Sequence, residues 1–248
     1  MTAPPIIETR NLSKRYGKIT AVDGLSLSIG AGEIFGLLGP NGSGKSSTIL
    51  MLMGLARPSG GTARVFGLDP AEKPLEIKRR VAYLPENVGF YGDLSGRQNL
   101  RFVAELNKMS REDAERGIEE ALAAVELSEA ADRPAGAYSR GMRQRLGLAE
   151  LLMKSPEIVF LDEPTLGLDP DGIDLMLNLL AALSTERGLT VLLSSHLLDL
   201  VERVAHRVAI LRQGRLRALG SVAELAGAAG LPSDLKAVYR HYFHRETE

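Results

Sequence analysis

The chain has 248 residues, of which 44% are hydrophobic and 25% charged, as is ordinary for one large or two small globular domains. Its 30 Lys and Arg residues balance 31 Asp and Glu residues, which excludes a general attraction of the whole chain to nucleic acid or anionic lipid. With no cysteine, it has no disulfide and no thiolate metal site. We expect no secretory signal and no membrane span, so work at a membrane would require a second chain.

The N-terminal third is expected to be rich in strands around one buried strand and one helix. Strand-like runs cover residues 6–16, 25–29 and 62–66, with glycine-containing turns beside them. Residues 34–38 form an apolar run typical of a buried strand. Residues 48–53 are typical of the first turns of a helix.

Between that strand and that helix lies the sequence Gly39-Pro40-Asn41-Gly42-Ser43-Gly44-Lys45-Ser46-Ser47. Glycine tolerates positive φ and has no Cβ, so backbone N–H groups can surround an anion at the positive end of the helix. In this context we expect Lys45 to contact the β- and γ-phosphates of a nucleoside triphosphate and the Ser46 hydroxyl to bind Mg²⁺. The alternative is a glycine-rich surface turn that binds nothing.

The rest of the chain divides into a helical region and an alternating region. Residues 95–152 have helical apolar spacing, with Ser110 as a helix start, and are expected to form an insertion in an α/β fold. The alternation of strands and helices around this region predicts a mainly parallel sheet with helices on both faces. We expect strands at 81–85, 158–161 and 190–194, helices at 171–183 and 197–204, and a hairpin at 208–219.

Polar side chains follow two of these buried strands. Asp162 and Glu163 end the strand at 158–161, where two carboxylates are unfavourable unless they act on a cation or a proton. We expect Asp162 to bind Mg²⁺ and Glu163 to accept a proton from an attacking water; an exposed turn is the alternative. His196 follows the next strand, where it either donates a hydrogen bond to the γ-phosphate or caps the following helix.

A second candidate anion site lies in Ser139-Arg140-Gly141-Met142-Arg143, which we call the signature loop. Ser139 is a natural N-cap for the helix that follows, and Gly141 leaves N–H groups accessible at the helix N-terminus. One nucleotide does not need two such helix ends from a single chain. A dimer in which each chain closes the other's nucleotide does need them.

Over about residues 6–225, these motifs together resemble the ATP-binding subunit of an ABC transporter. Tyr16 lies where that family stacks an aromatic ring on adenine. The remaining correspondences are Gly39–Ser47 to Walker A, Ile158–Glu163 to Walker B with its catalytic glutamate, the signature loop to the variant typical of exporters, Asp169 in Gly167-Leu168-Asp169 to the D-loop, and His196 to the switch histidine.

The resemblance implies an α/β P-loop NTPase (RecA-like) core with an N-terminal antiparallel β subdomain and a helical subdomain at about 88–152. We expect the ATP-binding domain at 1–226 and a short helical tail at 227–248. Two copies would dimerise head to tail around two ATP and Mg²⁺, with Ser139 and Gly141 of one copy on the γ-phosphate held by Lys45 of the other. Hydrolysis would drive a separate integral membrane permease from the cytoplasmic face of the membrane, with no nucleic acid as partner.

One position departs from the family pattern. Glu86 stands where the family has the Q-loop glutamine. A carboxylate can bind Mg²⁺ as the glutamine carbonyl does, but it adds negative charge beside the γ-phosphate. We therefore expect Glu86 to bind Mg²⁺ and to alter the Mg²⁺ dependence of hydrolysis.

Within that family, the chain most resembles the ATPase of the transporter that serves copper-site maturation in nitrous oxide reductase, although the tail before residue 235 is shorter. The resemblance lies in residues 83–87, 90–91, 94–97, 138–148 and 235–243. The alternatives are the ATPase of another exporter (of drugs, lipids or polysaccharides) and a soluble ABC ATPase acting on ribosomes or DNA. A catalytically inactive regulatory subunit would lack Lys45, Glu163 or His196, and all three are present.

Two further groups of residues are open at this level. Val88, Phe90 and Tyr91 either receive a helix of a membrane partner or anchor the helical region. His241 and His244 lie three residues apart in the tail and are a weak metal candidate without a third ligand.

Overall fold

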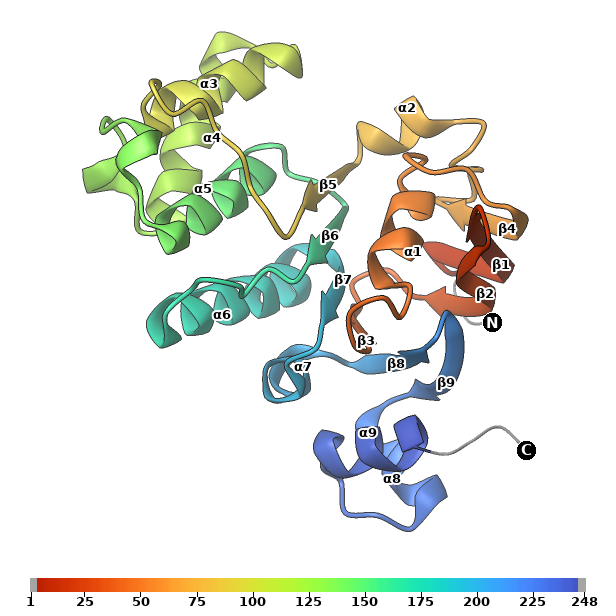
Figure 1. The fold of residues 1–248 in the computed structure, drawn as a ribbon. Coiled ribbons are helices and arrows are strands. Elements are labelled where there is room, and N and C mark those ends of the chain that lie inside the picture. Colours follow the sequence, from red (N-terminus) through yellow and green to blue (C-terminus); the bar gives the residue numbers. More distant parts are fainter. Residues whose placement is uncertain (1–3, 245–248) are drawn as a thin grey trace.

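The computed structural model describes residues 4–244, with the side chain of His244 excepted. Two sheets and the helices around them make up the chain, with a separate group of helices on one side (Figure 1). Within the described residues, no helix combines the length and apolarity that crossing a bilayer requires.

The larger sheet has six strands in the order β5-β6-β7-β3-β8-β9. All neighbouring pairs are parallel except β8 and β9, which form the expected antiparallel hairpin. The mainly parallel sheet is thus confirmed. Its strands are β3 (Ile34–Leu38), β5 (Val81–Leu84), β6 (Ile158–Asp162), β7 (Thr190–Ser195), β8 (Arg207–Arg212) and β9 (Arg215–Gly220).

The smaller sheet is the expected N-terminal antiparallel one. Its order is β2-β1-β4, with bounds β1 (Ile7–Tyr16), β2 (Ile19–Ile29) and β4 (Gly60–Val65). Side chains alternate across β3, so Phe35 and Leu37 join the core that faces this sheet and α1 (Lys45–Leu52), while Ile34 and Leu38 join the core on the opposite face. The central strand is therefore buried on both sides, and the loop after it has a rigid base.

Three helices form the group beside the sheets, and each begins at a serine cap. Ser95 and Gln98 make a capping box for α3 (Gly96–Leu106), and Ser110 accepts from the Asp113 N–H at the start of α4 (Arg111–Ala124). The third helix is α5 (Arg140–Met153), which Ser139 caps. Other helices, α6 (Pro170–Arg187) and α7 (Leu198–Val204), pack on the larger sheet's second face.

Two helices were not expected. α2 (Pro74–Lys78) has only five residues and buries only Ile77, so it leaves no periodic pattern. α8 (Val222–Ala229) is rich in Ala and Gly, yet its capping box of Ser221 and Glu224 is a sequence signal that the apolar spacing did not reveal. It spans residue 226, the expected boundary of the tail, so that division stays a prediction.

The tail helix was expected from its apolar spacing. α9 (Leu235–His244) buries Leu235 and Val238 completely, and its residues contact β8, β9, α7 and α8. The Tyr242 hydroxyl donates to the Leu225 carbonyl at 3.2 Å. This helix is therefore joined to the edge of the larger sheet by both apolar and polar contacts.

The closest backbone approach in the central strand is at Gly36. A Cβ there would lie 2.5 Å from Val201 Cγ1 and 3.1 Å from Val208 Cγ1. We predict that Gly36→Ala lowers the free energy of unfolding by about 1–3 kcal/mol, because an added methyl overpacks the contact between β3 and α7. Urea unfolding at equilibrium measures this change.

A matched control is Gly227→Ala, which adds the same methyl inside the exposed face of α8, where nothing lies within 4 Å. It should stabilise the chain by about 0.5–1 kcal/mol through helix propensity. If both substitutions changed the free energy of unfolding equally, close packing at Gly36 would not determine the stability of the chain.

Candidate nucleotide site

The loop from Gly39 to Gly44 joins β3 to α1 and presents the N-terminus of that helix. Gly44 is the N-cap, at φ 106°, and no side chain caps the helix. A Cβ on Gly44 would lie 2.5 Å from the Ala21 carbonyl oxygen, so glycine is required for this close approach. Gly42 has φ 80° and space around its Cα. The first N–H groups of α1 are left for an external acceptor, as binding a phosphate requires.

Lys45 is almost fully buried and lies across this loop. Its Nζ donates to the carbonyl oxygens of Gly39 at 2.8 Å and Pro40 at 3.3 Å. The same Nζ lies 3.2 Å from Oε1 of Glu163, and both side chains are under 10% exposed. Lys45 therefore connects the phosphate loop directly to the carboxylates at the end of β6.

Asp162 and Glu163 are positioned by the neighbouring strand β7. The Ser194 hydroxyl donates to Asp162 Oδ1, and the Glu163 N–H donates to the Ser194 carbonyl oxygen at 3.1 Å. Glu163 has φ 49°, a left-handed conformation of order 1–3 kcal/mol above the ordinary regions for a non-glycine residue. That backbone turn directs Glu163 toward Lys45, while Asp162 stays in the strand.

His196 contacts Glu163 rather than capping a helix. Its Nδ1 lies 2.8 Å from Glu163 Oε2, while the imidazole remains about half exposed. The N-cap of α7 is Leu197, whose N–H donates to the Ser195 hydroxyl at 3.0 Å. The capping alternative for His196 is therefore wrong, and each Glu163 oxygen has its own cationic or imidazole neighbour.

A pocket of ≈ 490 Å³ gathers most of the expected nucleotide-binding residues. Tyr16 lies at its rim, 47% exposed, with Lys14 Nζ 4.8 Å from the ring centroid. The pocket is lined by Tyr16, Ile19, Thr20, Ala21, Asn41, Gly42, Gly44, Lys45, Ser46, Ser47, Glu86, Asp162 and Glu163. Residues more than 140 positions apart in the chain thus face one space.

The oxygen atoms of this pocket fit Mg²⁺ together with a triphosphate. Burial raises the pKa of Tyr83 to about 12, and the charges of Asp162 and Glu86 act in the same direction, so both carboxylates act on one region. Mg²⁺ prefers oxygen ligands and usually combines one or two carboxylates with substrate phosphates. Within the described part of the chain, no cluster of three His, Cys, Asp or Glu side chains forms a metal site alone. Ser46, Glu86 and Asp162 therefore suit a cation that arrives with the nucleotide.

The signature loop does not reach the chain's own phosphate loop. It starts α5, which Figure 1 shows among the helices away from α1, and none of its residues lines the nucleotide pocket. The Ser139 hydroxyl accepts from the Met142 N–H at 3.1 Å, and Arg143 Nη1 donates to the Tyr138 carbonyl at 2.5 Å. The structure thus holds Ser139 as a helix cap, with Ser139 and Arg140 exposed.

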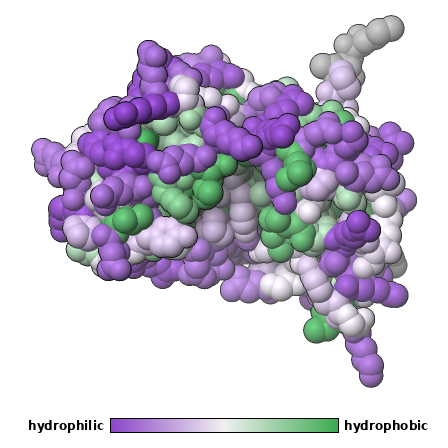
Figure 2. Space-filling model, turned by 90° about the horizontal axis from the view of Figure 1, so that it is seen from above, coloured by the Kyte–Doolittle hydropathy of each residue, from purple (hydrophilic) through white to green (hydrophobic). Residues whose placement is uncertain are grey.

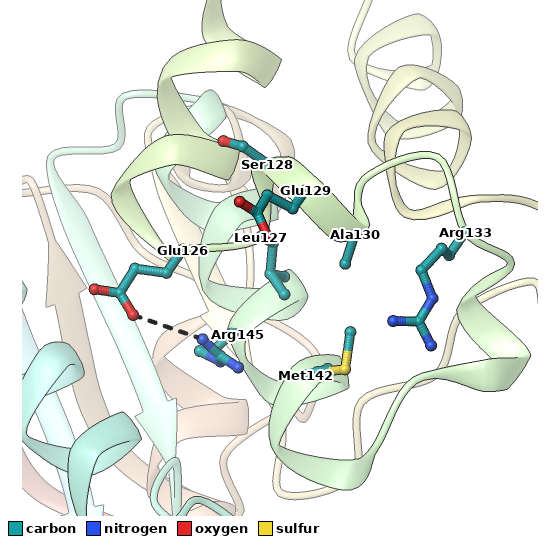
Figure 3. A pocket seen from close by; sticks show the side chains of 8 residues that line it. All are labelled: Glu126, Leu127, Ser128, Glu129, Ala130, Arg133, Met142 and Arg145. Atoms are coloured by element: carbon teal, nitrogen blue, oxygen red, sulfur yellow. Dashed lines mark ion pairs between the residues drawn. The ribbon is translucent and has the colours of Figure 1, made fainter.

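The far side of this helix end lines a second pocket, of ≈ 500 Å³. Figure 3 shows Met142 and Arg145 from α5 directed toward the space beside Arg133 and residues 126–130. Arg145 Nη1 lies 3.9 Å from Glu126 Oε2. Met142 is therefore turned toward the 126–133 segment and away from the chain's own nucleotide pocket.

Asp169 has a structural role in this chain. Its Oδ1 accepts from the Gly172 N–H at 2.8 Å and caps α6. The preceding Gly167 approaches Gly141 of the signature loop, where a Cβ on Gly141 would lie 3.2 Å from the Gly167 oxygen. The segment after Glu163 and the signature loop are therefore in contact within one chain.

The structure places the three apolar residues near Glu86, which the sequence left between two roles, in different environments. Val88 and Phe90 are partly buried against the larger core, whereas Tyr91 is 60% exposed and makes an edge contact with Phe102 at 5.2 Å. Apolar side chains also gather in separate patches among hydrophilic ones on the face seen in Figure 2. The His244 side chain lies outside the described residues, so the paired-histidine proposal stays a prediction.

Three contributions were missed or undervalued by sequence reasoning. Ser194, which donates to the Asp162 carboxylate and accepts from the Glu163 N–H, was noted only as part of a polar cluster after a strand. Residues 19–21 line the pocket because β2 passes beside Gly44, and only the three-dimensional neighbourhood reveals this. Lys14, whose Nζ also donates to the Arg57 carbonyl at 2.7 Å, supports Tyr16 from one side.

Comparison with known proteins places these features in a family. The family model described as "ABC transporter" matches residues 22–166. The bacitracin transport ATP-binding protein of Bacillus licheniformis is 41% identical over 211 residues, covering 85% of this chain and 68% of the relative. The daunorubicin/doxorubicin resistance ATP-binding protein of Streptomyces peucetius is 41% identical over 224 residues, covering 90% and 68%.

Solved structures agree with this placement. The structure of an ATP-binding subunit of an ABC transporter superposes with a TM-score of 0.88 and 29% identity, covering 96% of this chain and 99% of that one. A dimeric structure of a bacterial ABC transporter cassette gives a TM-score of 0.79 and 27% identity, covering 87% of this chain and 98% of that one.

The hydrogen bond from Ser194 to the Asp162 carboxylate yields a prediction. Ser194→Ala removes the hydroxyl that orients Asp162, so we expect Mg²⁺-dependent ATP hydrolysis to fall about 10–100-fold, as for loss of an outer-shell ligand contact. Initial rates over a Mg²⁺ series measure it, with a higher half-saturating Mg²⁺ concentration as the signature.

The neighbouring Ser195→Ala is the matched control. Its hydroxyl accepts from Leu197 and contacts neither carboxylate in the structure, since successive side chains of β7 point to opposite faces. If Ser195→Ala changed the Mg²⁺ dependence as much as Ser194→Ala, orientation of Asp162 by Ser194 would be wrong.

Proposed function

The chain belongs to the ABC transporter family, and from that premise we propose that it is the ATP-hydrolysing subunit of an exporter, acting as a pair of copies on a separate membrane permease. One observation carries the proposal. The phosphate loop, Asp162 and Glu163 face a single pocket, with His196 in contact with Glu163 behind them.

The roles of the side chains follow from their contacts. Lys45 reaches both the phosphate loop and Glu163, so it is placed to neutralise charge on the β- and γ-phosphates. Glu163 accepts the proton of the attacking water, and His196 holds the second carboxylate oxygen in position. When bound, Mg²⁺ supplies charge neutralisation between the phosphates, and Ser46, Asp162 and Glu86 are the residues that would hold it.

The Lys45–Glu163 ion pair suggests how substrate prepares the base. If Lys45 moves from Glu163 to a phosphate, Oε1 loses its cationic partner, while Oε2 keeps the His196 contact. Oε1 is then left to accept a hydrogen bond from the attacking water, on the same side as the phosphate.

The proposal of a pair rests on what one chain does not provide. The signature loop presents an uncovered helix end away from its own pocket, which a second copy would complete in a head-to-tail arrangement. Similarity to a bacterial cassette whose solved structure is dimeric supports a pair of copies. Tyr16, with Lys14 on one side of its ring, would stack on adenine.

For the class of transporter, the similar proteins support an exporter of drugs. The relatives at 41% identity are named for bacitracin transport and for daunorubicin and doxorubicin resistance, which favours export of amphipathic drug-like compounds. The comparisons give no support for copper-site maturation, which stays a secondary proposal. In either case we place the chain at the cytoplasmic face of a membrane, bound to its permease.

The general base is tested by Glu163→Gln. We predict that hydrolysis falls about 10²–10⁴-fold, the usual contribution of general acid–base catalysis, while ATP still binds because the phosphate loop is intact. Steady-state hydrolysis and equilibrium binding of a fluorescent ATP analogue measure the two properties separately.

Glu157→Gln is the control, because Glu157 stands at the opposite end of β6 and pairs with Arg80 on the surface. It should hydrolyse ATP at the parent rate. A Glu163→Gln variant that also kept the parent rate would remove Glu163 as the base, whereas loss of ATP binding would point to damage in the phosphate loop.

The role of Glu86 is tested by Glu86→Gln, which restores the family's residue. If Glu86 helps to bind Mg²⁺, the half-saturating Mg²⁺ concentration should rise about tenfold, since an amide is the weaker ligand for a hard cation. Hydrolysis rates across a Mg²⁺ series decide this. No change in either the rate or the Mg²⁺ dependence would exclude Glu86 as a ligand.

A further inference from the structure

Arg140 lies in the signature loop and rests on the segment that follows the carboxylates. A Cβ built on Gly167 would lie 2.4 Å from Arg140 Cδ, 2.7 Å from Cγ and 2.8 Å from Nε. The aliphatic part of Arg140 therefore occupies the space that any side chain at position 167 would take. Gly167 also has φ 87°, which favours glycine there. The glycine thus provides a seat for the Arg140 side chain.

This contact fixes the side chain without neutralising it. Arg140 is exposed, and among the described residues its guanidinium has no ion pair or hydrogen bond. By contrast, Arg143 donates to a backbone carbonyl, and Asp169, close by in the same segment, caps α6. A positioned, unpaired guanidinium has donors available for an external anion.

The charge of the nucleotide pocket calls for an additional cation. Of the charged residues that line it, Lys45 is positive, whereas Glu86, Asp162 and Glu163 are negative. A triphosphate remains negative even with its Mg²⁺, and the carboxylate of Glu86 stands where the family has a neutral glutamine. Electrostatic stabilisation of phosphoryl transfer depends on positive groups aimed at the terminal phosphate.

We propose that Arg140 of one copy donates its guanidinium to the terminal phosphate bound by Lys45 of the partner copy, where it offsets the charge of Glu86. The proposal rests on the head-to-tail pair proposed above. Arg140 stands between Ser139 and Gly141, the two residues expected at that phosphate. Its planar fork matches the phosphate oxygens, and the Gly167 seat limits its freedom before the phosphate arrives.

Arg140→Met separates this role from a purely structural brace. Met keeps an aliphatic stem over Gly167 but removes the charge. We expect kcat to fall about 10²-fold, the loss typical of removing one preorganised donor, with KM for ATP within about twofold because every residue that lines the nucleotide pocket is kept. Unchanged kcat with an unchanged melting temperature would overturn the proposal.

If Arg140 offsets the negative charge of Glu86, removing that charge should partly restore the activity of an Arg140 variant. In a Glu86→Gln background, Arg140→Met should cost several-fold less in kcat than in the parent chain, because one negative charge has gone from the same site. Multiplicative losses in the double variant would mean that the two charges do not meet, and would overturn this part of the proposal.

Mixing of variants tests whether Arg140 acts in the partner's site. Lys45→Ala and Arg140→Met chains are each inactive or weak alone, but in a mixed pair one site combines an intact phosphate loop with an intact Arg140. Hydrolysis by equimolar mixtures should therefore exceed the mean of the two separate preparations at least several-fold. A parallel mixture of Lys45→Ala with Ser139→Ala tests the pair itself.

The two mixtures distinguish the possible failures. Complementation in both supports the proposal. Complementation by the Ser139 mixture alone keeps the head-to-tail pair and overturns the role of Arg140. Failure of both mixtures overturns the head-to-tail pair and, with it, the proposal for Arg140.

Discussion

The ion pair between Lys45 and Glu163 is the contact on which the site depends, because it joins the phosphate loop to the carboxylate that follows β6. At 3.2 Å, between two side chains under 10% exposed, it lies in a region where charges interact strongly and an unpaired charge is unfavourable. Glu163 balances this cation on one oxygen and His196 on the other. A phosphate that competes for Lys45 therefore changes the environment of the base directly.

The parallel sheet is what brings these groups together. β3, β6 and β7 are adjacent and parallel, so their carboxyl ends deliver Gly39, Asp162 and Ser194 to one edge. Burial of β3 on both faces holds that edge rigid, and Ser194 then links β7 to β6 through the Asp162 carboxylate and the Glu163 N–H. The geometry of the site is thus a consequence of strand order, although its residues are distant in sequence.

The sequence was sufficient to predict the strands, loops and helices that have a strong local pattern. The strand at Ile34–Leu38, the glycine loop and the alternating C-terminal region each have a period or a composition that one structure satisfies. It missed α2, which is too short to show a period, and it left His196 between two roles because nothing local distinguishes a helix cap from a carboxylate partner. The placement of Ser194 and the seat of Arg140 on Gly167 depend on packing between distant segments, which no local pattern encodes.

The central claim is that two copies share each nucleotide, and the cysteine-free chain allows a direct test. The measurement is disulfide formation in a chain carrying Asn41→Cys in the phosphate loop, Ser139→Cys in the signature loop, and Glu163→Gln to slow turnover. The account predicts a covalent dimer on a denaturing gel that forms with Mg-ATP, and that neither single-cysteine chain gives. A disulfide within one chain, or a dimer equally abundant without nucleotide, would contradict it.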